Sequence, residues 1–443
     1  MKPMFQEEIK FFKEKTGIDL PNTCWRDGSK IYVDMYFRDF PLYQFKVENK
    51  IIKITKNNTD KLKDYIPISL FDTIQRERER VFQLSVQSIK KVINTFSQDP
   101  YKTTKTILAY SGGKDSDVLL DICLKANIPF ILNFANTSND TVDTYRHVKE
   151  TKSKIENEHP YNIMNPQKGY YQWIKDKNYF IPNRLVRNCC STFKEGQLTQ
   201  HYNKNEPLIQ LLGVRKNESV KRAKYEYIMD NNFYINLFGK NSNPKKWISV
   251  APLIDWYDED IWIYILMNNI KYNKQYEYGF ERCGCLICPY QSDYTDLLIE
   301  NFYPYLWNRW MSEIIPQNYK NCHIEQNTKY TLEEYKNGKW KTGTSKLYEI
   351  VNKKPIKQRI SQVMEILGLT DEKIALQYFN HTCSNCGKKL TPTDSAMNMK
   401  FFGRQIDMNK GLCKSCMCKE FNWSRKEYSK KVQNFIDSGC HLF

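Results

Sequence analysis

The run SGGKDS, residues 111–116, places two glycines, a lysine and two serines in six consecutive positions. The preceding run TKTILAY (104–110) is apolar and rich in β-forming residues, which predicts a short buried strand. In the following run DVLLDICLKA (117–126) the apolar residues have helical spacing. A strand, a glycine turn and a helix direct backbone N–H groups and a positive helix end toward an anion. These residues therefore predict a phosphate-binding loop, distinct from the GxxxxGK[ST] loop because Asp115 follows the lysine.

The C-terminal cysteines have the spacing of a zinc site. CSNC (383–386) and CKSC (413–416) are separated by 26 residues. Four thiolates at this spacing form a tetrahedral Zn²⁺ site, and a small domain needs such a structural metal ion to fold. The predicted ligands are Cys383, Cys386, Cys413 and Cys416.

A second group of cysteines lies in the middle of the chain. Cys189 and Cys190 adjoin, and ERCGCLICPYQ (281–291) supplies Cys283, Cys285 and Cys288. Neighbouring cysteines rarely form a disulfide with each other without strain, whereas thiolates can face one metal centre together. In a reducing compartment, the fourteen cysteines indicate metal or redox chemistry before disulfides. A structural zinc and buried reduced thiols are the alternatives to a metal cluster here.

Composition bounds the class of protein. The 443 residues, 41% of them hydrophobic, are too many for one ordinary core and predict a multidomain globular chain. No run of 18 apolar residues occurs, and MKPMFQEEIK is no secretion signal, so we expect a soluble cytoplasmic protein without membrane association. The net charge of +17 indicates contact with a polyanion such as nucleic acid. A genome that favours lysine, asparagine, isoleucine and tyrosine is the alternative explanation.

The order of elements predicts four parts. Residues 1–98 form an α+β domain of unknown role, with a helix near 72–96 and a turn at Trp25–Asp27. In residues 99–300 the strands TILAY, PFILNFAN, PLIQLLGV and WISVAPL alternate with helical stretches. This alternation predicts a doubly wound parallel α/β sheet with ligands beyond the carboxyl ends of its strands. Residues 301–380 form a helical connector, amphipathic around 356–378, and residues 381–443 form the zinc ribbon.

Several motifs of the middle part carry a family resemblance. SGGKDS matches SGGxDS, the signature of the PP-loop ATP pyrophosphatases, which grip the two outer phosphates that leave together. The middle part as a whole resembles the phosphoadenosine phosphosulfate reductase superfamily. The motifs that carry this resemblance, in chain order, are FANTSNDTVDTYRHV (134–148), RNCCSTFK (187–194), LLGVRKNESVKRA (211–223) and PLIDWYDEDIW (252–262).

The resemblance implies roles for the residues of the loop. Lys114 and the backbone of Gly112 and Gly113 would hold pyrophosphate, and the hydroxyls of Ser111 and Ser116 would bond its oxygens. Asp115 would cap the helix or hold Mg²⁺, which neutralises the leaving group.

Residues outside the loop complete the implied nucleotide site. Asn136 would bind the nucleotide, while Arg215, Arg222 and Lys194 would face its phosphates or a sulfuryl group. Arginine forks and lysine charges suit phosphate. Surface salt bridges are the alternative for each of these basic residues.

The cysteine pair followed by CxxC resembles the iron–sulfur subgroup of the sulfonucleotide reductases. In that subgroup four cysteines hold a [4Fe–4S] cluster, and a proline after the last cysteine also occurs in ferredoxin-type runs. The implied ligands here are Cys189, Cys190, Cys285 and Cys288, with Cys283 as a substitute.

Two enzyme hypotheses follow, and the intact loop favours the first. In the first, similar to the DNA phosphorothioation ATPases, the protein cleaves ATP to AMP and pyrophosphate to activate a nucleic acid, DNA rather than RNA, for sulfur insertion. Its cofactors would be ATP, Mg²⁺, a [4Fe–4S] cluster and Zn²⁺, with a cysteine desulfurase or another sulfur donor as partner. In the second, it is an adenylyl sulfate or phosphoadenylyl sulfate reductase that releases sulfite and uses a tail thiol such as Cys440. A nucleotide-sensing DNA-binding regulator is the non-enzymatic alternative.

Overall fold

The computed structural model of the chain describes residues 1–184, 188–203, 205–219, 222–230, 232–233, 246–322, 324, 330–342, 360–361, 364, 372, 381–403 and 408–437. The chain forms two compact units. The first comprises residues 1–177, 188–234 and 243–310, and the second comprises residues 178–187, 235–242 and 311–443. No helix of the described ranges combines the length and the apolar character that crossing a membrane requires.

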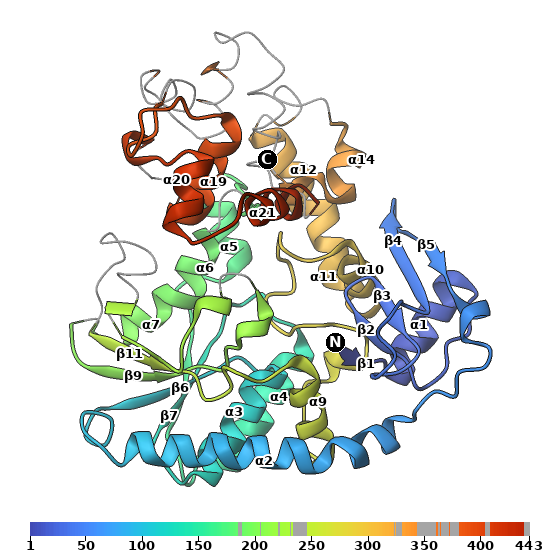
Figure 1. Cartoon of the computed structure of the whole chain (residues 1–443), viewed down its shortest axis with the longest axis vertical. Helices are drawn as coiled ribbons and strands as arrows, with labels where there is room; N and C mark the ends of the chain where they lie inside the picture. The colour runs from blue at the N-terminus through green and yellow to red at the C-terminus, as the bar shows by residue number, and fades with distance from the viewer. Residues whose placement is uncertain are drawn as a thin grey trace. The chain divides into compact units, whose positions relative to one another are not determined.

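A six-stranded sheet forms the centre of the first unit, in the order β10-β11-β9-β6-β7-β8 (Figure 1). Its strands are β6 (Thr106–Tyr110), β7 (Ile131–Ala135), β8 (Tyr161–Met164), β9 (Leu208–Leu211), β10 (Ile228–Met229) and β11 (Trp247–Val250). All pairs are parallel except β10 with β11. From β6 the chain winds outward to β7 and β8, then returns to β9 and β11 on the other side. The order therefore reverses between β6 and β9, the switch point at which doubly wound folds bind ligands.

Side chains alternate across this sheet because successive residues of a strand point to opposite faces. Leu108 and Tyr110 of β6 join the main core, which also contains buried residues of α2 (Leu70–Phe96), α3 (Lys114–Lys125) and α9 (Asp258–Met267). Ile107 packs on the opposite face, in a smaller cluster with Tyr202, Leu208 and Trp247. Leu198 of α7 (Gly196–His201) borders that second cluster. Helices thus cover both faces, which confirms the predicted doubly wound α/β fold.

The four predicted strands of the middle part are all present. TILAY coincides with β6, and the other three predicted runs contain β7, β9 and β11. The short strands β8 and β10 were not predicted, because each lies at an edge of the sheet and lacks a continuous buried apolar run. The remaining helices of this unit are α4 (Val142–Ile155), α5 (Tyr170–Asp176), α6 (Asn188–Cys190), α10 (Asp293–Phe302) and α11 (Pro304–Arg309).

The N-terminal residues form a separate antiparallel sheet in the same unit. Its strands follow chain order: β1 (Lys2–Pro3), β2 (Trp25–Asp27), β3 (Lys30–Tyr32), β4 (Tyr43–Glu48) and β5 (Ile51–Asn57). Helix α1 (Gln6–Thr16) lies between β1 and β2 along the chain. The turn expected at Trp25–Asp27 is therefore wrong, because this run pairs with both β1 and β3 as β2.

Helix α2 agrees with the predicted helix near 72–96, and the Ser69 side chain caps it by accepting a hydrogen bond from the Asp72 amide. Val81, Val92 and Phe96 of α2 belong to the main core, together with Trp25. The structure therefore groups residues 1–98 with the central sheet in one compact unit, because α2 and the N-terminal residues bury side chains in that core.

The second unit contains α12 (Ile315–Asn321), α14 (Leu332–Glu334), α15 (Trp340–Thr342) and the C-terminal helices α19 (Pro392–Phe402), α20 (Lys414–Glu420) and α21 (Arg425–Asp437). A small apolar cluster joins the C-terminal helices through Met397, Leu412, Met417 and Tyr428. Most of the predicted amphipathic stretch 356–378 lies outside the described residues, and so does Cys440.

Candidate nucleotide and metal sites

The SGGKDS loop connects β6 to α3 at the switch point of the sheet. Gly112 has φ +70°, and a Cβ atom there would lie 3.1 Å from Val148 Cγ2. Glycine thus meets both the left-handed backbone and the close packing of α4. Gly113 is the N-cap of α3, so the loop leads directly into a helix N-terminus.

Ser116 holds the loop in shape. Its hydroxyl donates to the Gly113 carbonyl at 2.7 Å and accepts from the amides of Gly113 at 3.1 Å and Ser111 at 3.3 Å. Among the described residues, none accepts a hydrogen bond from the amides of Gly112 and Asp115. These two N–H groups at the start of α3 remain available to an anion.

Four buried or half-buried charges lie beside the loop. Lys114 Nζ is 2.9 Å from Asp115 Oδ2 and 3.0 Å from Asp258 Oδ1. Arg215 contacts the same two carboxylates, with Nε 2.6 Å from Asp115 and Nη2 2.8 Å from Asp258. The side chains of Lys114 and Arg215 are only 4% and 3% exposed. These two positive and two negative charges form a neutral quartet at the carboxyl ends of β6 and β9, and the N-terminal ammonium of Met1 adds a further cation 3.6 Å from Asp258 Oδ2.

The quartet keeps its charges because each group faces opposite partners. Burial alone would lower the pKa of Lys114, but the carboxylates of Asp115 and Asp258 raise it above its usual value. Burial would raise the pKa of Asp258, but Lys114 and Arg215 hold it well below its usual range. Asp258 therefore stays ionised near neutral pH and suits a cation ligand rather than a general base.

Two features of the quartet depend on residues far along the chain. Asp258 is the first residue of α9 and was missed by sequence reasoning; its signal was an acidic residue at a helix N-terminus. Gly213, which precedes Arg215 in the Gly-x-Arg motif, approaches the backbone of α3. A Cβ atom at Gly213 would lie 3.0 Å from the Asp115 carbonyl oxygen, so only glycine brings this loop close enough.

The other predicted nucleotide-binding residues lie outside this quartet. Asn136 follows β7, where its side chain bonds Asn165, Ser138 and Tyr145. Arg222 forms an ion pair with Glu218. Lys194 lies among the cysteines. Its Nζ is 3.9 Å from the position that a Cβ atom would occupy if one were added to Gly284. Their roles toward a nucleotide stay predictions.

A loop that sequence reasoning missed supports the phosphate-binding loop. The Tyr276 hydroxyl accepts from the Lys114 amide at 2.9 Å, and Asn273 Nδ2 donates to the Gly112 carbonyl at 3.3 Å. Gln275 accepts from the Thr144 hydroxyl of α4 at 2.8 Å. These contacts position the loop and the first turn of α3 from outside the SGGKDS run.

The N-terminal residues fix that supporting loop through buried ions. Glu8 is fully buried, and its two oxygens contact Lys2 Nζ at 2.5 Å and Arg26 Nε at 2.5 Å. Arg26 Nη2 donates to the Gly279 carbonyl at 2.5 Å, and Lys2 Nζ donates to the Tyr276 carbonyl at 3.2 Å. Breaking a buried pair by removing one partner typically costs 3–5 kcal/mol. The N-terminal sheet therefore anchors the loop that supports the SGGKDS run.

The cysteine loop 283–288 is held by two amide side chains. Asn139 follows β7. Its side-chain Nδ2 donates to the Ile287 carbonyl at 2.9 Å, and its backbone carbonyl accepts from the Leu286 amide. Gln291 donates to the Cys285 carbonyl at 3.2 Å and accepts from the Cys288 amide at 3.1 Å. These hydrogen bonds of Asn139 and Gln291 hold Cys285 and Cys288 near the carboxyl end of the sheet.

The four cysteines implied by the resemblance lie within electrostatic reach of one another. Hydrogen bonding with Cys190, burial, and the charges of Cys190, Cys285 and Cys288 raise the pKa of the Cys189 thiol. The pKa of Lys194 is raised by Cys285 first, against burial, and then by Asp140, Cys190 and Cys288. A lysine beside several thiols is the partner that an anionic thiolate-bound centre needs.

The thiols of Cys189, Cys190, Cys285 and Cys288 differ in grouping from those at the C-terminus. Within the part of the chain that the structure describes, only the C-terminal cysteines gather three or more ligand atoms within 4.8 Å of one another. A [4Fe–4S] cluster attaches each thiolate to a different iron, so its ligands stand farther apart than those of one ion. The cluster on Cys189, Cys190, Cys285 and Cys288 stays a prediction.

Cys283 has a different environment from its neighbours. Burial raises the pKa of its thiol, while the hydrogen bond from Tyr276 lowers it. Its Cβ lies 3.8 Å from the position of a Cβ atom on Gly113. Cys283 thus contacts the phosphate-binding loop, and the arrangement favours Cys285 over Cys283 as a cluster ligand.

The C-terminal cysteines form the predicted metal site. The ligand atoms of Cys383, Cys386, Cys413 and Cys416 all lie within 4.8 Å of one another, and Cys386 Sγ is 3.6 Å from Cys413 Sγ. Asn398 supports the second knuckle by bonding both the amide and the carbonyl of Leu412. Four thiols in one such group fit a tetrahedral Zn²⁺.

We expect the double change Cys383→Ser and Cys413→Ser to remove about one zinc ion per chain while the iron content stays unchanged, because the two cysteine sets are distinct. Metal analysis of protein purified without oxygen measures both metals. Loss of iron in this variant would show that the two metal assignments are reversed.

In the comparison with known proteins, one matched segment contains both the phosphate-binding loop and the cysteine loop 283–288. Residues 105–291 match the phosphoadenosine phosphosulfate reductase domain. Over 297 residues the chain is 30% identical to the uncharacterized protein MJ0066 of Methanocaldococcus jannaschii, covering 62% of this chain and 55% of the relative. It is 27% identical over 194 residues to the adenosine 5'-phosphosulfate reductase of Oceanobacillus iheyensis, covering 44% of this chain and 75% of that protein. It is 26% identical over 200 residues to the sulfate adenylyltransferase subunit 2 of a Rhizobium species, covering 42% of this chain and 63% of the relative.

The chain spans little more than half the length of the M. jannaschii relative. The matched segment 105–291 contains the SGGKDS loop, Arg215, Asp258 and the cysteine loop. The N-terminal sheet and the C-terminal metal site lie outside it.

Proposed function

We propose, from the premise that residues 105–291 form a phosphoadenosine phosphosulfate reductase domain, that the protein cleaves ATP to AMP and pyrophosphate to activate a nucleic acid for sulfur modification. The observation that carries the proposal is the intact SGGKDS loop with Lys114 and Arg215 buried beside it at the switch point. A sulfonucleotide reductase has no pyrophosphate to expel and does not need this loop.

The neutral quartet suggests how a polyphosphate would bind. Lys114 and Arg215 would exchange carboxylate partners for phosphate oxygens, joined by the free amides of Gly112 and Asp115. The released carboxylates of Asp115 and Asp258 would then face the phosphates. Two carboxylates beside a polyphosphate suit Mg²⁺, which takes one or two carboxylates plus phosphate oxygens. In this proposal the site therefore requires ATP and Mg²⁺ together.

The reaction itself needs little covalent chemistry from the protein. An oxygen of the acceptor attacks the α-phosphorus, the bond to the bridging oxygen breaks, and pyrophosphate leaves with the electron pair. Hydrosulfide from a sulfur donor then attacks the acceptor atom that carries the adenylated oxygen, the bond to that oxygen breaks, and AMP leaves with the electron pair. Lys114 and Arg215 stabilise the charge that develops on the leaving group. A cluster on Cys189, Cys190, Cys285 and Cys288 supplies redox or sulfur chemistry when bound.

Charge supports a nucleic-acid acceptor. Residues 151–250 carry 17 Lys/Arg against 8 Asp/Glu, and residues 381–443 carry 11 against 5. On α21, Lys426 and Lys430 are exposed. Such basic surfaces release counterions from a phosphate backbone when they bind it.

We expect the binding of a DNA duplex to weaken steeply with salt, and the double change Lys426→Gln and Lys430→Gln to reduce the log–log salt slope by about 2. The double change Lys10→Gln and Lys53→Gln removes the same charge from the N-terminal part and serves as the control. Fluorescence anisotropy at several salt concentrations measures the slope. A slope that both variants leave unchanged would contradict a role for α21.

A reductase is the second candidate, favoured by the 27% identity to the adenosine 5'-phosphosulfate reductase of O. iheyensis. It would reduce adenylyl sulfate to sulfite with a thiol donor and would depend on a nucleophilic tail cysteine. Changing Cys440 to serine separates the two candidates, because only the reductase requires that thiol.

A further inference from the structure

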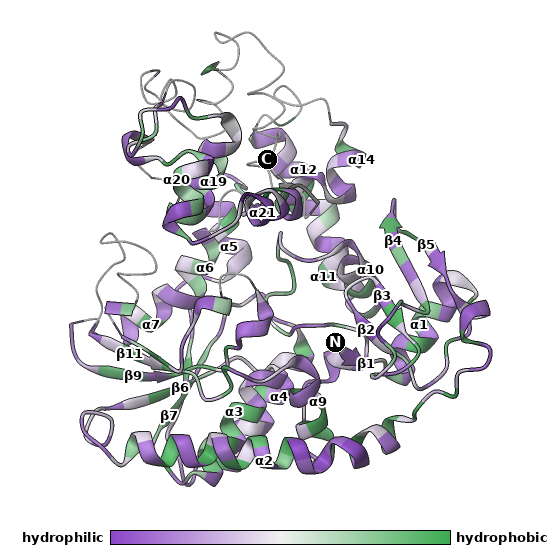
Figure 2. Ribbon diagram, in the orientation of Figure 1, coloured by the Kyte–Doolittle hydropathy of each residue, from purple (hydrophilic) through white to green (hydrophobic). Residues whose placement is uncertain are grey.

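Helix α2 has an apolar stripe that the core does not use. Val81, Val92 and Phe96 bury one face of the helix in the main core. Three other large apolar side chains of α2 are exposed: Phe71 by 67%, Phe82 by 50% and Ile93 by 41%. Figure 2 shows both hydrophobic and hydrophilic segments on α2, and its longest hydrophilic run is QRERER, residues 75–80.

The exposed side chains lie on one line of the helix. Positions 71, 82 and 93 are each 11 residues apart, which is close to three helical turns, so they fall within about 20° of a common line. The half-buried Val86 lies on the same strip, whereas Ile89 beside it packs against the main core. Around the helix axis, the strip is offset by about 90° from the face that packs in the main core. It is therefore available for a contact other than the one with the core.

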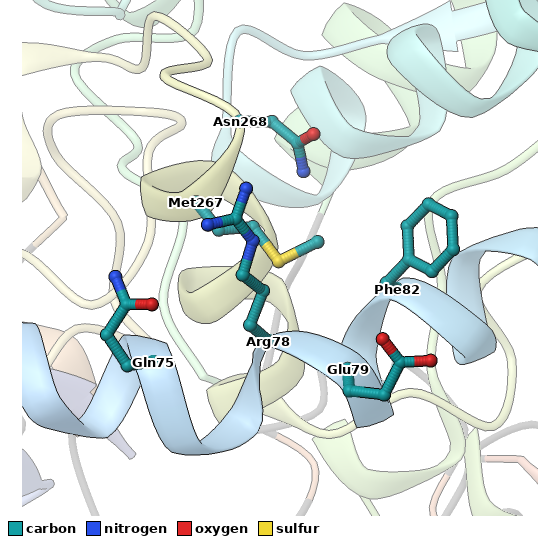
Figure 3. A pocket seen from close by; sticks show the side chains of 6 residues that line it. All are labelled: Gln75, Arg78, Glu79, Phe82, Met267 and Asn268. Atoms are coloured by element: carbon teal, nitrogen blue, oxygen red, sulfur yellow. The ribbon is translucent and has the colours of Figure 1, made fainter.

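The stripe borders a hollow between α2 and the end of α9. The hollow has a volume of about 480 Å³ and is lined by Gln75, Arg78, Glu79, Phe82, Met267 and Asn268 (Figure 3). Figure 3 shows the Phe82 ring at one side of this hollow and the Met267 side chain near its floor. Phe82 and Met267 are its apolar side chains, and the other four lining residues are polar or charged.

We propose that α2 packs antiparallel against α2 of a second copy of this chain, around a two-fold axis at Phe82. Phe82 is the midpoint between Phe71 and Ile93. An axis there places Phe71 of each copy opposite Ile93 of the other and brings the two Phe82 side chains together. Val86 of one copy then faces the hollow beside Phe82 of the other. A self-complementary patch of this kind is what an isologous dimer requires.

The exposed charges of α2 favour the same two-fold axis at Phe82. Asp72 lies ten residues before Phe82 and Lys90 lies eight residues after it, and both are exposed on the same side of the stripe. In an antiparallel pair around this two-fold axis, the same side of each α2 faces the same way, but the two helices run in opposite directions. Asp72 of one copy therefore lies close to Lys90 of the other. A parallel pairing would instead align like residues, Asp72 with Asp72 and Lys90 with Lys90.

The size of the stripe sets the expected affinity. Stable interfaces bury about 800 Å² on each partner, and one face of a helix about 40 Å long lies near the lower end of that class. We therefore expect a dimer with a dissociation constant on the order of micromolar. The contact involves none of the loop, quartet or cluster residues, so it does not depend on the proposed reaction.

Engineered cross-linking tests the axis directly. In Phe82→Cys the two new thiols would meet at the axis, and a disulfide-linked dimer is expected on a non-reducing gel after mild oxidation. Gln87→Cys places an equally exposed thiol on another side of α2 and is the matched control. A mixture of Phe71→Cys and Ile93→Cys chains should give a mixed dimer. Cross-linking of Phe82→Cys no greater than that of Gln87→Cys would overturn the proposal.

Light scattering on the full-length protein gives an independent test. The wild-type chain should have a dimer mass at concentrations above about ten micromolar, and Phe82→Glu should be monomeric with unchanged iron and zinc contents. A monomeric wild-type chain at a hundred micromolar would contradict the proposal, and so would a Phe82→Glu variant that remains dimeric.

Discussion

Replacing Lys114 with alanine is expected to lower the rate of pyrophosphate release from ATP by at least about 10²- to 10³-fold, the loss typical of removing one donor from a developing charge. Lys114 is buried, and its ammonium group is the only lysine charge in the quartet beside the loop. Its loss removes the one lysine cation that faces both Asp115 and Asp258. Quantifying pyrophosphate by a coupled assay, without oxygen, measures the effect.

Lys125→Ala is the matched control, because Lys125 is at the opposite end of α3 and is half-exposed. Lys114→Arg tests whether charge alone suffices, since arginine keeps the charge but not the compact ammonium group. Pyrophosphate release by folded Lys114→Ala at the wild-type rate would contradict the assigned role of the loop.

The double change Cys189→Ser and Cys288→Ser is expected to remove the iron and the brown colour of protein purified without oxygen. The reason is that the implied cluster loses two of its four thiolates. Cys283→Ser is the matched control from the same loop. Its thiol is hydrogen-bonded to Tyr276 and lies beside Gly113, so iron should remain.

Iron content and visible absorption measure this prediction. A colourless wild-type protein that contains only zinc, after expression with ample iron, would contradict the cluster. If Cys283→Ser lost its iron while the double variant kept it, Cys283 would be a cluster ligand and the assignment of Cys189 and Cys288 would be wrong.

The part of the site that sequence predicts best is the part that is contiguous. β6, the SGGKDS loop and α3 follow one another, and hydropathy, glycine placement and helix spacing all agree along this run. The alternation of strands and helices also predicted the doubly wound sheet, but not the order of its strands. The zinc knuckles were predictable because each CxxC pair is local and the fold only has to bring two pairs together.

The residues that sequence missed act through long-range contacts. Asp258 reaches Lys114 only because β11 and α9 bring it to the switch point. Tyr276 caps the start of α3 through its hydroxyl, although a tyrosine within an irregular run has no pattern that predicts this contact.

Arg26 illustrates the same limit. In the sequence it lies in a short polar run that suggests a turn, but in the structure it is a buried ion between Glu8 and Glu281. Only the packing of the N-terminal sheet against the supporting loop gives it a partner. Lys194 shows the converse, because a motif predicted its importance but its neighbours are cysteines rather than the quartet.

The central claim is that the loop serves the cleavage of ATP between its α and β phosphates, and product analysis without oxygen tests it most directly. The protein is incubated with ATP, Mg²⁺, DNA and a sulfur donor, and separately with adenylyl sulfate and a thiol. We predict AMP and pyrophosphate in equal amounts from the first mixture, faster with DNA than without it, and no sulfite from the second. Sulfite from adenylyl sulfate, with ATP left intact, would contradict the account and identify a reductase.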